Sequence, residues 1–185
     1  MNTARFPIHF IGAGPGAEDL ITERGAALLK EADVVVYAGS LVNPAHLKRC
    51  RPEAELHDSA RMNLKEQVEV MARGVLEGKK VVRLHTGDPS MYGAVAEQFD
   101  LLDKKGIESI VVPGVSSVFA AAAALRTELT YPGLAQSLVL TRTPGRTPMP
   151  SGEACEAFAK TGATLAFFLS AGKLDELAAR LVSAG

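Results

Sequence analysis

Residue types that could hold a small ligand gather in the stretch "GDPSMYG", residues 87–93. Gly87 permits a close approach of the main chain, and Asp88 offers acceptors that suit a ribose diol or a cationic group. Pro89 fixes the path of the turn, and Ser90 can cap the helix that follows. Asp-Pro sequences also organise turns that hold no ligand. The residue types alone therefore leave two interpretations open, a binding turn or a purely structural one.

A second glycine-rich stretch, "FIGAGPGAEDLIT", occupies residues 10–22. Gly12, Gly14 and Ala17 fit the loose form of the dinucleotide fingerprint, in which small residues let the backbone approach a pyrophosphate. That fingerprint needs an acidic residue at the end of the next strand, but the next apolar run, "DVVVYAG", ends near Tyr37. A nicotinamide cofactor is therefore disfavoured, and by itself this motif is best explained as a tight turn without a ligand.

A third turn follows the apolar run "IVVPG" and carries Ser116 and Ser117 before an alanine-rich helix. The two hydroxyls can face a ligand or only cap the helix. All three turns follow strand-like runs, and ligands of open α/β sheets bind outside the carboxyl ends of the strands. Their convergence on one sheet edge favours a binding site more than any one of them does.

Strand-like and helix-like runs alternate along the chain, which is typical of an α/β fold with a largely parallel sheet. Gly78 and Gly106 stand where helices should stop. The prolines and glycines after residue 127 change this texture, so we expect two α/β domains, residues 1–127 and 136–185, joined by a linker at about 128–135. The second domain has only two clear strands, so we expect it to be incomplete at Gly185.

The composition excludes several classes of function. The 20 lysine and arginine residues nearly balance 21 aspartate and glutamate residues, so no basic field indicates a nucleic-acid partner. No apolar run approaches the roughly 18 residues of a membrane span, and no signal-peptide pattern opens the chain. Cys50 and Cys155 are far apart and form no metal-ligand pattern, so we expect neither a disulfide nor a metal site. A cytoplasmic location is the expectation.

Taken together, "GAGPGAEDLIT", "ADVVVYAGSLV", "GDPSMYG" and "PGVSS" resemble, in order and spacing, the signature blocks of the tetrapyrrole methylases. Members of this family methylate corrin and sirohaem precursors with S-adenosylmethionine and release S-adenosylhomocysteine. The resemblance implies two α/β domains with the cofactor in the cleft between them, and a homodimer. Residues 141–153, "TRTPGRTPMPSGE", most resemble the members that methylate carbon 11 of precorrin-4 or of its cobalt-containing counterpart.

The resemblance also implies which residues bind the ligands. The turn at residues 86–88 should cradle S-adenosylmethionine, which carries no phosphate and so needs no acidic ribose clamp. The implied cofactor contacts are Pro15, Thr86, Gly87, Asp88, Met91, Ser116, Ser117 and, from the second domain, Leu169. The substrate bears several carboxylates, which guanidinium groups bind well, so Arg142 and Arg146 are the predicted substrate-binding residues.

The sequence does not single out one catalytic residue. The methyl donor is activated by its own charge, so no nucleophile is required, and a base that removes a proton could be Asp88, Tyr92 or His85. His85, on a strand, is more often a structural histidine. The alternatives to the predicted function are another tetrapyrrole methylase, acting on precorrin-2, precorrin-3 or uroporphyrinogen III, and a non-catalytic nucleotide-binding domain.

Overall fold

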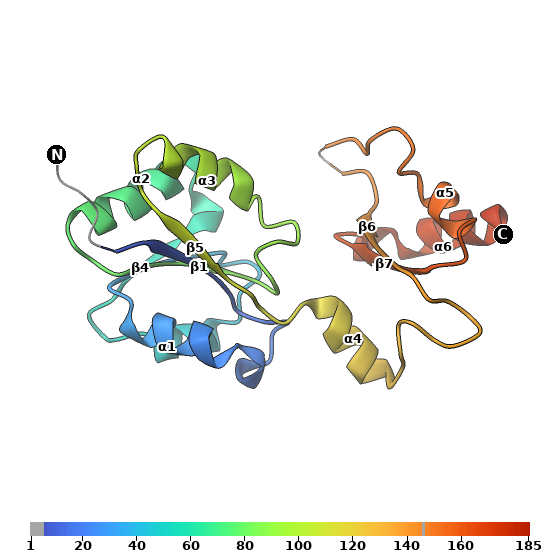
Figure 1. The fold of residues 1–185 in the computed structure, drawn as a ribbon, viewed down its shortest axis with the longest axis horizontal. Helices are drawn as coiled ribbons and strands as arrows, with labels where there is room; N and C mark the ends of the chain where they lie inside the picture. The colour runs from blue at the N-terminus through green and yellow to red at the C-terminus, as the bar shows by residue number, and fades with distance from the viewer. Residues whose placement is uncertain (1–5, 146) are drawn as a thin grey trace. The chain divides into compact units, whose positions relative to one another are not determined.

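The computed structural model describes residues 6–145 and 147–185. The chain forms two compact units, unit 1 up to Ala120 and unit 2 from Ala121 to Gly185. The division falls inside helix α4 (Ser117–Leu125), ahead of the linker expected at about 128–135. Both units combine parallel strands with helices, which confirms the predicted α/β class (Figure 1).

Unit 1 is built on a five-stranded parallel sheet with the strand order β3-β2-β4-β1-β5. The strands are β1 (Ile8–Gly12), β2 (Val34–Tyr37), β3 (Glu55–Asp58), β4 (Val81–His85) and β5 (Ser109–Val112). Because all five are parallel, their carboxyl ends lie at one edge of the sheet. β1 and β4 are the central neighbours, so the glycine-rich turns that follow them meet in the middle of that edge.

Helices cover both faces of this sheet (Figure 1). α1 (Glu23–Glu31) packs on one face, and α2 (Leu64–Leu76) and α3 (Val95–Asp103) pack on the other. Alternate residues of β1 separate accordingly: Phe10 joins the core under α2 and α3, and Ile11 joins the core under α1. β1, β2 and β4 are buried on both faces, which explains why they read as largely apolar runs, whereas β3 at the edge of the sheet has the sequence Glu-Leu-His-Asp and is partly exposed.

Local signals mark the helix ends. Thr22 caps the start of α1, where its side chain accepts a hydrogen bond from the Gly25 N–H, and a capping box of Asn63 and Glu66 opens α2. Gly78 follows α2 in the left-handed region with φ of 78°, where a glycine meets no steric penalty. The described residues of unit 1 also form three short 3-10 helices: η1 (Glu18–Leu20), η2 (Pro44–Arg49) and η3 (Ser59–Arg61).

Unit 2 contains a two-stranded parallel sheet of β6 (Leu138–Arg142) and β7 (Thr164–Phe168). A short 3-10 helix, η4 (Ala171–Lys173), leads into α6 (Leu174–Ala184), which packs against α5 (Cys155–Ala159). Both strands were expected from the sequence, whereas α5 was not. Among the described residues, no helix is long and apolar enough to cross a membrane.

Candidate functional site

The turns after β1 and β4 are joined through their main chains. Gly14 and Gly87 form an antiparallel bridge, in which the Gly87 N–H donates to the Gly14 carbonyl at 2.8 Å and the Gly14 N–H donates back at 3.2 Å. The Ala13 N–H donates to the His85 carbonyl at 2.7 Å. The two glycine-rich turns that the sequence singled out are therefore one structure.

Three glycines, Gly12, Gly87 and Gly114, make this structure possible, and we call them the glycine junction. A Cβ atom added to Gly12 would lie 2.5 Å from the Gly114 Cα, and one added to Gly114 would lie 2.7 Å from the Gly12 Cα. Either Cβ would also overlap the Gly87 carbonyl oxygen. Gly87 itself has φ of 59°, and the side where its Cβ would stand is open. The junction therefore brings β1, β4 and β5 together while leaving one face of Gly87 free.

Asp88 locks the turn. Its Oδ1 accepts a hydrogen bond from the Ser90 N–H and its Oδ2 accepts one from the Gly114 N–H, both at 2.8 Å. The carboxylate thus links the loop after β4 to the turn after β5, as the structural interpretation of this residue expects. Hydrogen bonds to a charged acceptor are stronger than those between neutral groups. Asp88 therefore fixes the position of the main chain at the junction.

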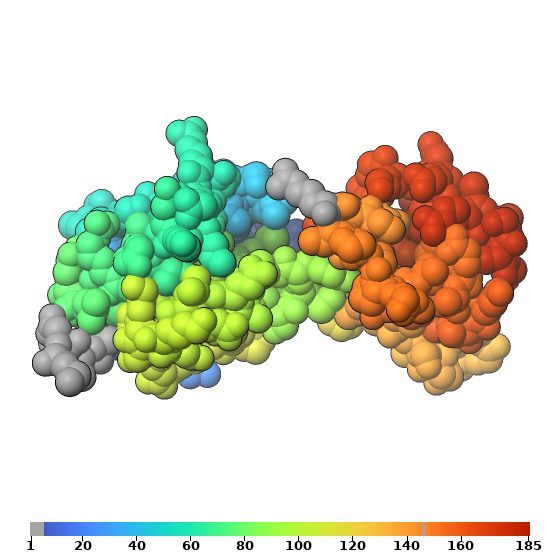
Figure 2. All heavy atoms as spheres, turned by 90° about the horizontal axis from the view of Figure 1, so that it is seen from above, coloured from blue at the N-terminus to red at the C-terminus, as the bar shows by residue number. Residues whose placement is uncertain are grey.

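The other predicted cofactor residues of unit 1 surround the same edge. Pro15 is half-buried in the loop before η1, and the Asn43 side chain holds that loop by donating to the Gly16 carbonyl at 2.7 Å. Thr86 is exposed, and Met91 is half-buried. The loop of residues 86–94, which also exposes Tyr92, reaches the surface of the unit (Figure 2). The structure brings these residues together at the carboxyl ends of β1 and β4.

Ser116 and Ser117 lie where α4 begins. Ser116 is buried, and its carbonyl accepts hydrogen bonds from the N–H groups of Phe119 and Ala120, at 3.1 and 3.3 Å. Ser117 is the first residue of α4 and is exposed. Both follow β5 by a few residues, so they belong to the same edge of the sheet.

His85 does not suit the role of a base. Its side chain is 4% exposed, and its ring stacks on Phe10 with centroids 6.0 Å apart. Burial, with a smaller contribution from the Arg83 charge, lowers the pKa of His85 to about 3. The imidazole is neutral at pH 7 and binds a proton too weakly to serve as a general base there. Its place on the strand supports the structural interpretation.

In unit 2, a pair of hydroxyls joins the ends of the two strands, and we call Thr143 and Ser170 the hydroxyl pair. Ser170 Oγ accepts from the Thr143 N–H at 3.0 Å, lies 3.0 Å from Thr143 Oγ1 and donates to the Phe168 carbonyl at 2.7 Å. Leu169 stands between Phe168 and Ser170 with φ of 55° and 74% of its surface exposed. A leucine in this region is strained, and the hydroxyl pair holds the flanking residues in place.

Arg142, at the end of β6, is committed to the loop that follows. Its guanidinium donates to the carbonyls of Thr143, Thr147 and Pro148 at 3.1 to 3.2 Å and to Thr147 Oγ1 at 2.9 Å. These bonds order the proline-rich loop in which the sequence predicted substrate binding. Arg146, the second predicted substrate residue, lies outside the described residues.

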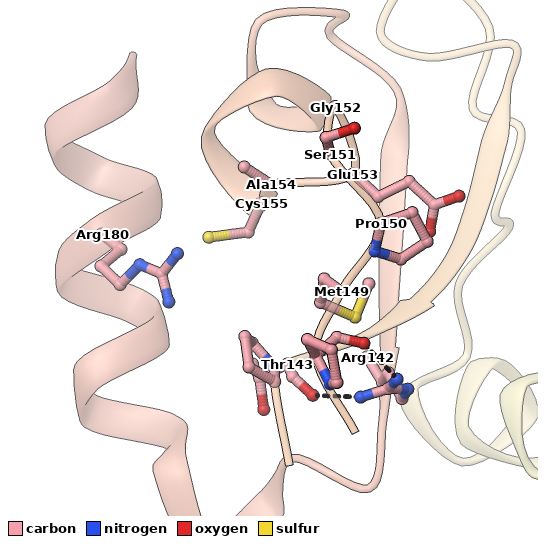
Figure 3. Close-up of a pocket in the computed structure, with 12 residues that line it drawn as sticks. Arg142, Thr143, Met149, Pro150, Ser151, Gly152, Glu153, Ala154, Cys155 and Arg180 are labelled. Carbon is pink, nitrogen blue, oxygen red and sulfur yellow. Dashed lines mark hydrogen bonds between the residues drawn. The ribbon is translucent and has the colours of Figure 1, made fainter. Parts of the chain in front are cut away.

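The same loop lines a cavity of about 340 Å³ within unit 2. In Figure 3 the sulfur of Cys155 points toward Arg180 of α6. Arg180 forms a two-pronged ion pair with Glu156, at 2.7 and 3.1 Å, so its charge is already balanced. Within the described part of the chain, no group of His, Cys, Asp or Glu is arranged to hold a metal ion.

Sequence reasoning missed the hydroxyl pair, although the rule that found the turns of unit 1 applies to it as well. Thr143 is the first residue after β6 and Ser170 is the second residue after β7, so both stand at the carboxyl ends of parallel strands. The signal was present, but threonine and serine at strand ends are common. A glycine in a turn indicates a positive φ or a close approach of the backbone, whereas a threonine or serine indicates neither and is therefore not distinctive in the sequence.

Comparisons with known proteins agree with this geometry. A family model described as Tetrapyrrole (Corrin/Porphyrin) Methylases matches residues 7–184. The cobalt-precorrin-4 C(11)-methyltransferase of Methanocaldococcus jannaschii is 50% identical over 175 residues, which are 95% of this chain and 68% of that protein.

Two solved structures extend the agreement to the fold. A crystal structure of a cobalamin biosynthetic enzyme, cobalt precorrin-4 methyltransferase, has a TM-score of 0.93 at 49% identity and covers 96% of this chain and 74% of its own. Uroporphyrin-III C-methyltransferase from Thermus thermophilus, in complex with S-adenosyl homocysteine, has a TM-score of 0.78 at 28% identity, with 97% and 73% covered. The family and fold expected from the signature blocks are confirmed.

Proposed function

Since the chain belongs to the tetrapyrrole (corrin/porphyrin) methylase family, we propose that it transfers a methyl group from S-adenosylmethionine to carbon 11 of precorrin-4 or its cobalt-containing counterpart. The observation that carries the proposal is the 50% identity to a cobalt-precorrin-4 C(11)-methyltransferase over 95% of this chain. The TM-score of 0.93 to a cobalt precorrin-4 methyltransferase supports it, against 0.78 for a uroporphyrin-III methyltransferase.

The residues at the edge of the sheet suit S-adenosylmethionine. Gly87 has an open side where any other residue would carry a side chain, so a ligand can approach the main chain there. The turns after β1 and β4 contain Pro15 and Pro89, which have no N–H that could bind a phosphate. S-adenosylmethionine carries no phosphate, so it does not need such a donor. We propose the following cofactor contacts: Pro15, Thr86, Gly87, Asp88, Met91, Ser116, Ser117 and Leu169.

The chemistry requires positioning more than a reactive side chain. When bound, S-adenosylmethionine supplies a methyl group that is already activated by the positive sulfonium. The glycine junction and Asp88 hold the main chain of the turn rigid, so that it can align the donor with the acceptor carbon. Alignment and exclusion of water together contribute up to about 7 to 11 kcal/mol in such reactions. Arg142 and Arg146 are the proposed partners of the substrate carboxylates.

The reaction is tested with purified protein, S-adenosylmethionine carrying a labelled methyl group, and precorrin-4 or cobalt-precorrin-4. We expect one labelled methyl at carbon 11, identified by carbon NMR of the product. Transfer to uroporphyrinogen III or precorrin-2 in place of precorrin-4 would contradict the proposed substrate. Transfer to none of them, with no binding of S-adenosylhomocysteine, would favour a non-catalytic domain.

Arg142→Ala tests whether the loop after β6 serves substrate binding and not cofactor binding. We expect the substrate KM to rise about tenfold, because the loop loses the bonds that order it, while the affinity for S-adenosylhomocysteine stays unchanged. Arg24→Ala, on the exposed side of α1, is the matched control and should change neither quantity. Loss of both affinities in Arg142→Ala would contradict the assignment of this loop to the substrate.

A homodimer and a cytoplasmic location complete the proposal. Large apolar side chains are exposed in unit 2, among them Leu134 at 79% and Val182 at 83%, which supports association with a second copy. Light scattering after size exclusion should give twice the mass of the chain, and a monomer at all concentrations would contradict it. Cell fractionation checks the proposed cytoplasmic location.

A further inference from the structure

Arg83 is a buried cation among neutral partners. It lies on β4, between β2 and β1, and 5% of its surface is exposed. Its guanidinium donates to the Val36 carbonyl at 3.2 Å, to Gln98 Oε1 at 3.3 Å and to Gln67 Oε1 at 3.4 Å. None of the ion pairs among the described residues includes it. Burial lowers the pKa of Arg83 to about 10, so it stays charged at pH 7.

A buried charge without a counterion is costly, and the acceptors that compensate it are strongly oriented by it. Gln98 is 2% exposed on α3, and its oxygen faces the guanidinium. The amide nitrogen of Gln98 must therefore point the other way, and it donates to the Ala94 carbonyl at 3.1 Å. Gln67 on α2 behaves alike, with its nitrogen donating to the Met62 carbonyl at 3.1 Å.

Ala94 is a place where the chain needs such support. It is the residue before α3 and has φ of 48°, and Tyr92 has φ of 54°. Non-glycine residues enter this left-handed region only at a steric cost, and they stay there when the surroundings hold them. No side chain caps the start of α3. The hydrogen bond from the Gln98 side chain thus adds a tertiary contact to the carbonyl at the end of the loop.

The loop of residues 86–94 is consequently held at both ends. Asp88 fixes its first part through the N–H groups of Ser90 and Gly114, and Gln98 fixes its last residue. Met91, a proposed cofactor contact, lies between the two anchors. We propose that Arg83 is a positioning residue, which acts through Gln98 to set the end of this loop and thereby the affinity for the methyl donor. This inference rests on the proposed function.

Gln98→Glu separates positioning from stability. A carboxylate at this position still accepts from Arg83 and now neutralises its charge, but it has no N–H for the Ala94 carbonyl. We expect an unchanged or higher melting temperature and a Kd for S-adenosylhomocysteine raised about tenfold, measured by calorimetry. A purely structural role of the network would leave the Kd unchanged.

Gln67→Glu is the matched control. It makes the same change to a partner of the same guanidinium, and it removes the N–H from the Met62 carbonyl instead. We expect its Kd to stay within about twofold of the wild type. An equal loss of affinity in both variants would overturn the proposal, because the charge of Arg83, and not the bond to Ala94, would then be responsible. An unchanged Kd in Gln98→Glu would overturn it as well.

Hydrogen exchange of the ligand-free protein tests the positioning role of Arg83 independently of the proposed function. Gln98→Glu should speed exchange in the peptide that covers residues 88–98, whereas Gln67→Glu should not. If the wild type fails to bind S-adenosylhomocysteine, the proposed function is overturned, and unchanged exchange in Gln98→Glu would still overturn the positioning role. Should Gln98→Glu not fold, Gln98→Met, which keeps the shape and removes the amide, is read in the same way.

Discussion

The ends of the parallel strands are joined in two different ways in the two units. In unit 1, Gly12, Gly87 and Gly114 pack main chain against main chain, so that no side chain separates the strands. In unit 2, the hydroxyls of Thr143 and Ser170 make the connection. The first arrangement depends on the absence of a Cβ, and the second depends on specific donors and acceptors.

The residue that each junction presents also differs. Gly87 and Leu169 have nearly the same φ, 59° and 55°. Glycine adopts it without strain and offers its main chain, whereas leucine adopts it at a cost and offers a large apolar side chain that is 74% exposed. We propose on this basis that unit 1 contributes its main chain to the cofactor contacts and that unit 2 contributes an apolar side chain.

The largest effect is expected from Gly114→Ala. The added Cβ would overlap the Gly87 carbonyl oxygen and crowd the Gly12 Cα at 2.7 Å, both of them backbone atoms that cannot rotate away. We expect a loss of about 3 kcal/mol in the free energy of unfolding, measured by urea titration. Gly172→Ala, where a Cβ meets nothing within 4 Å, is the control and should change it by less than about 0.5 kcal/mol. Similar values for the two variants would mean that the junction is not close-packed.

A smaller effect is expected from Ser170→Ala. The substitution removes the acceptor of the Thr143 N–H and leaves buried polar groups unsatisfied, which costs about 2 kcal/mol. The affinity for S-adenosylhomocysteine should fall as well, since Leu169 loses its support. Ser183→Ala, on the exposed side of α6, should leave both quantities unchanged. If folded Ser170→Ala binds S-adenosylhomocysteine as tightly as the wild type, the hydroxyl pair does not contribute to cofactor binding.

Leu169→Gly should move stability and binding in opposite directions. Glycine removes the strain of the left-handed conformation, which is worth about 1 kcal/mol, and partly offsets this gain through its own chain entropy. We therefore expect the melting temperature to stay the same or rise slightly, and the Kd for S-adenosylhomocysteine to increase. A lower melting temperature with unchanged Kd would give Leu169 a structural role only.

The smallest effect concerns the pH dependence of unit 2. The hydrogen bonds from Arg180 lower the pKa of Glu156 from 4.5 to about 2. A lowered carboxyl pKa stabilises the fold above pH 4.5, and this stabilisation is lost as the pH falls toward 2. Glu156→Gln should slightly reduce the change in the free energy of unfolding between pH 5 and pH 2. The effect is small because both side chains are partly exposed to solvent. An unchanged slope would show that the pair contributes nothing.

Sequence patterns predicted unit 1 better than unit 2 for physical reasons. The junction glycines are marked by the turns that need them, and β1, β2 and β4 are largely apolar runs, so the parallel sheet and the meeting of the turns at its edge could be predicted. β3, with the sequence Glu-Leu-His-Asp, gave no such signal. α5 spans only Cys155–Ala159, too short for a helical period to stand out. Arg83 reads as a surface charge, because a pattern of residue types carries no record of the tertiary partners that bury it.

The central claim is that the edge of the unit 1 sheet binds S-adenosylmethionine, and calorimetric titration tests it most directly. The protein is titrated with S-adenosylhomocysteine and, separately, with oxidised nicotinamide dinucleotide. We expect selective binding of S-adenosylhomocysteine with a Kd near 1 μM, about −8 kcal/mol. Binding of the dinucleotide in its place would contradict a site for S-adenosylmethionine at this edge of the sheet.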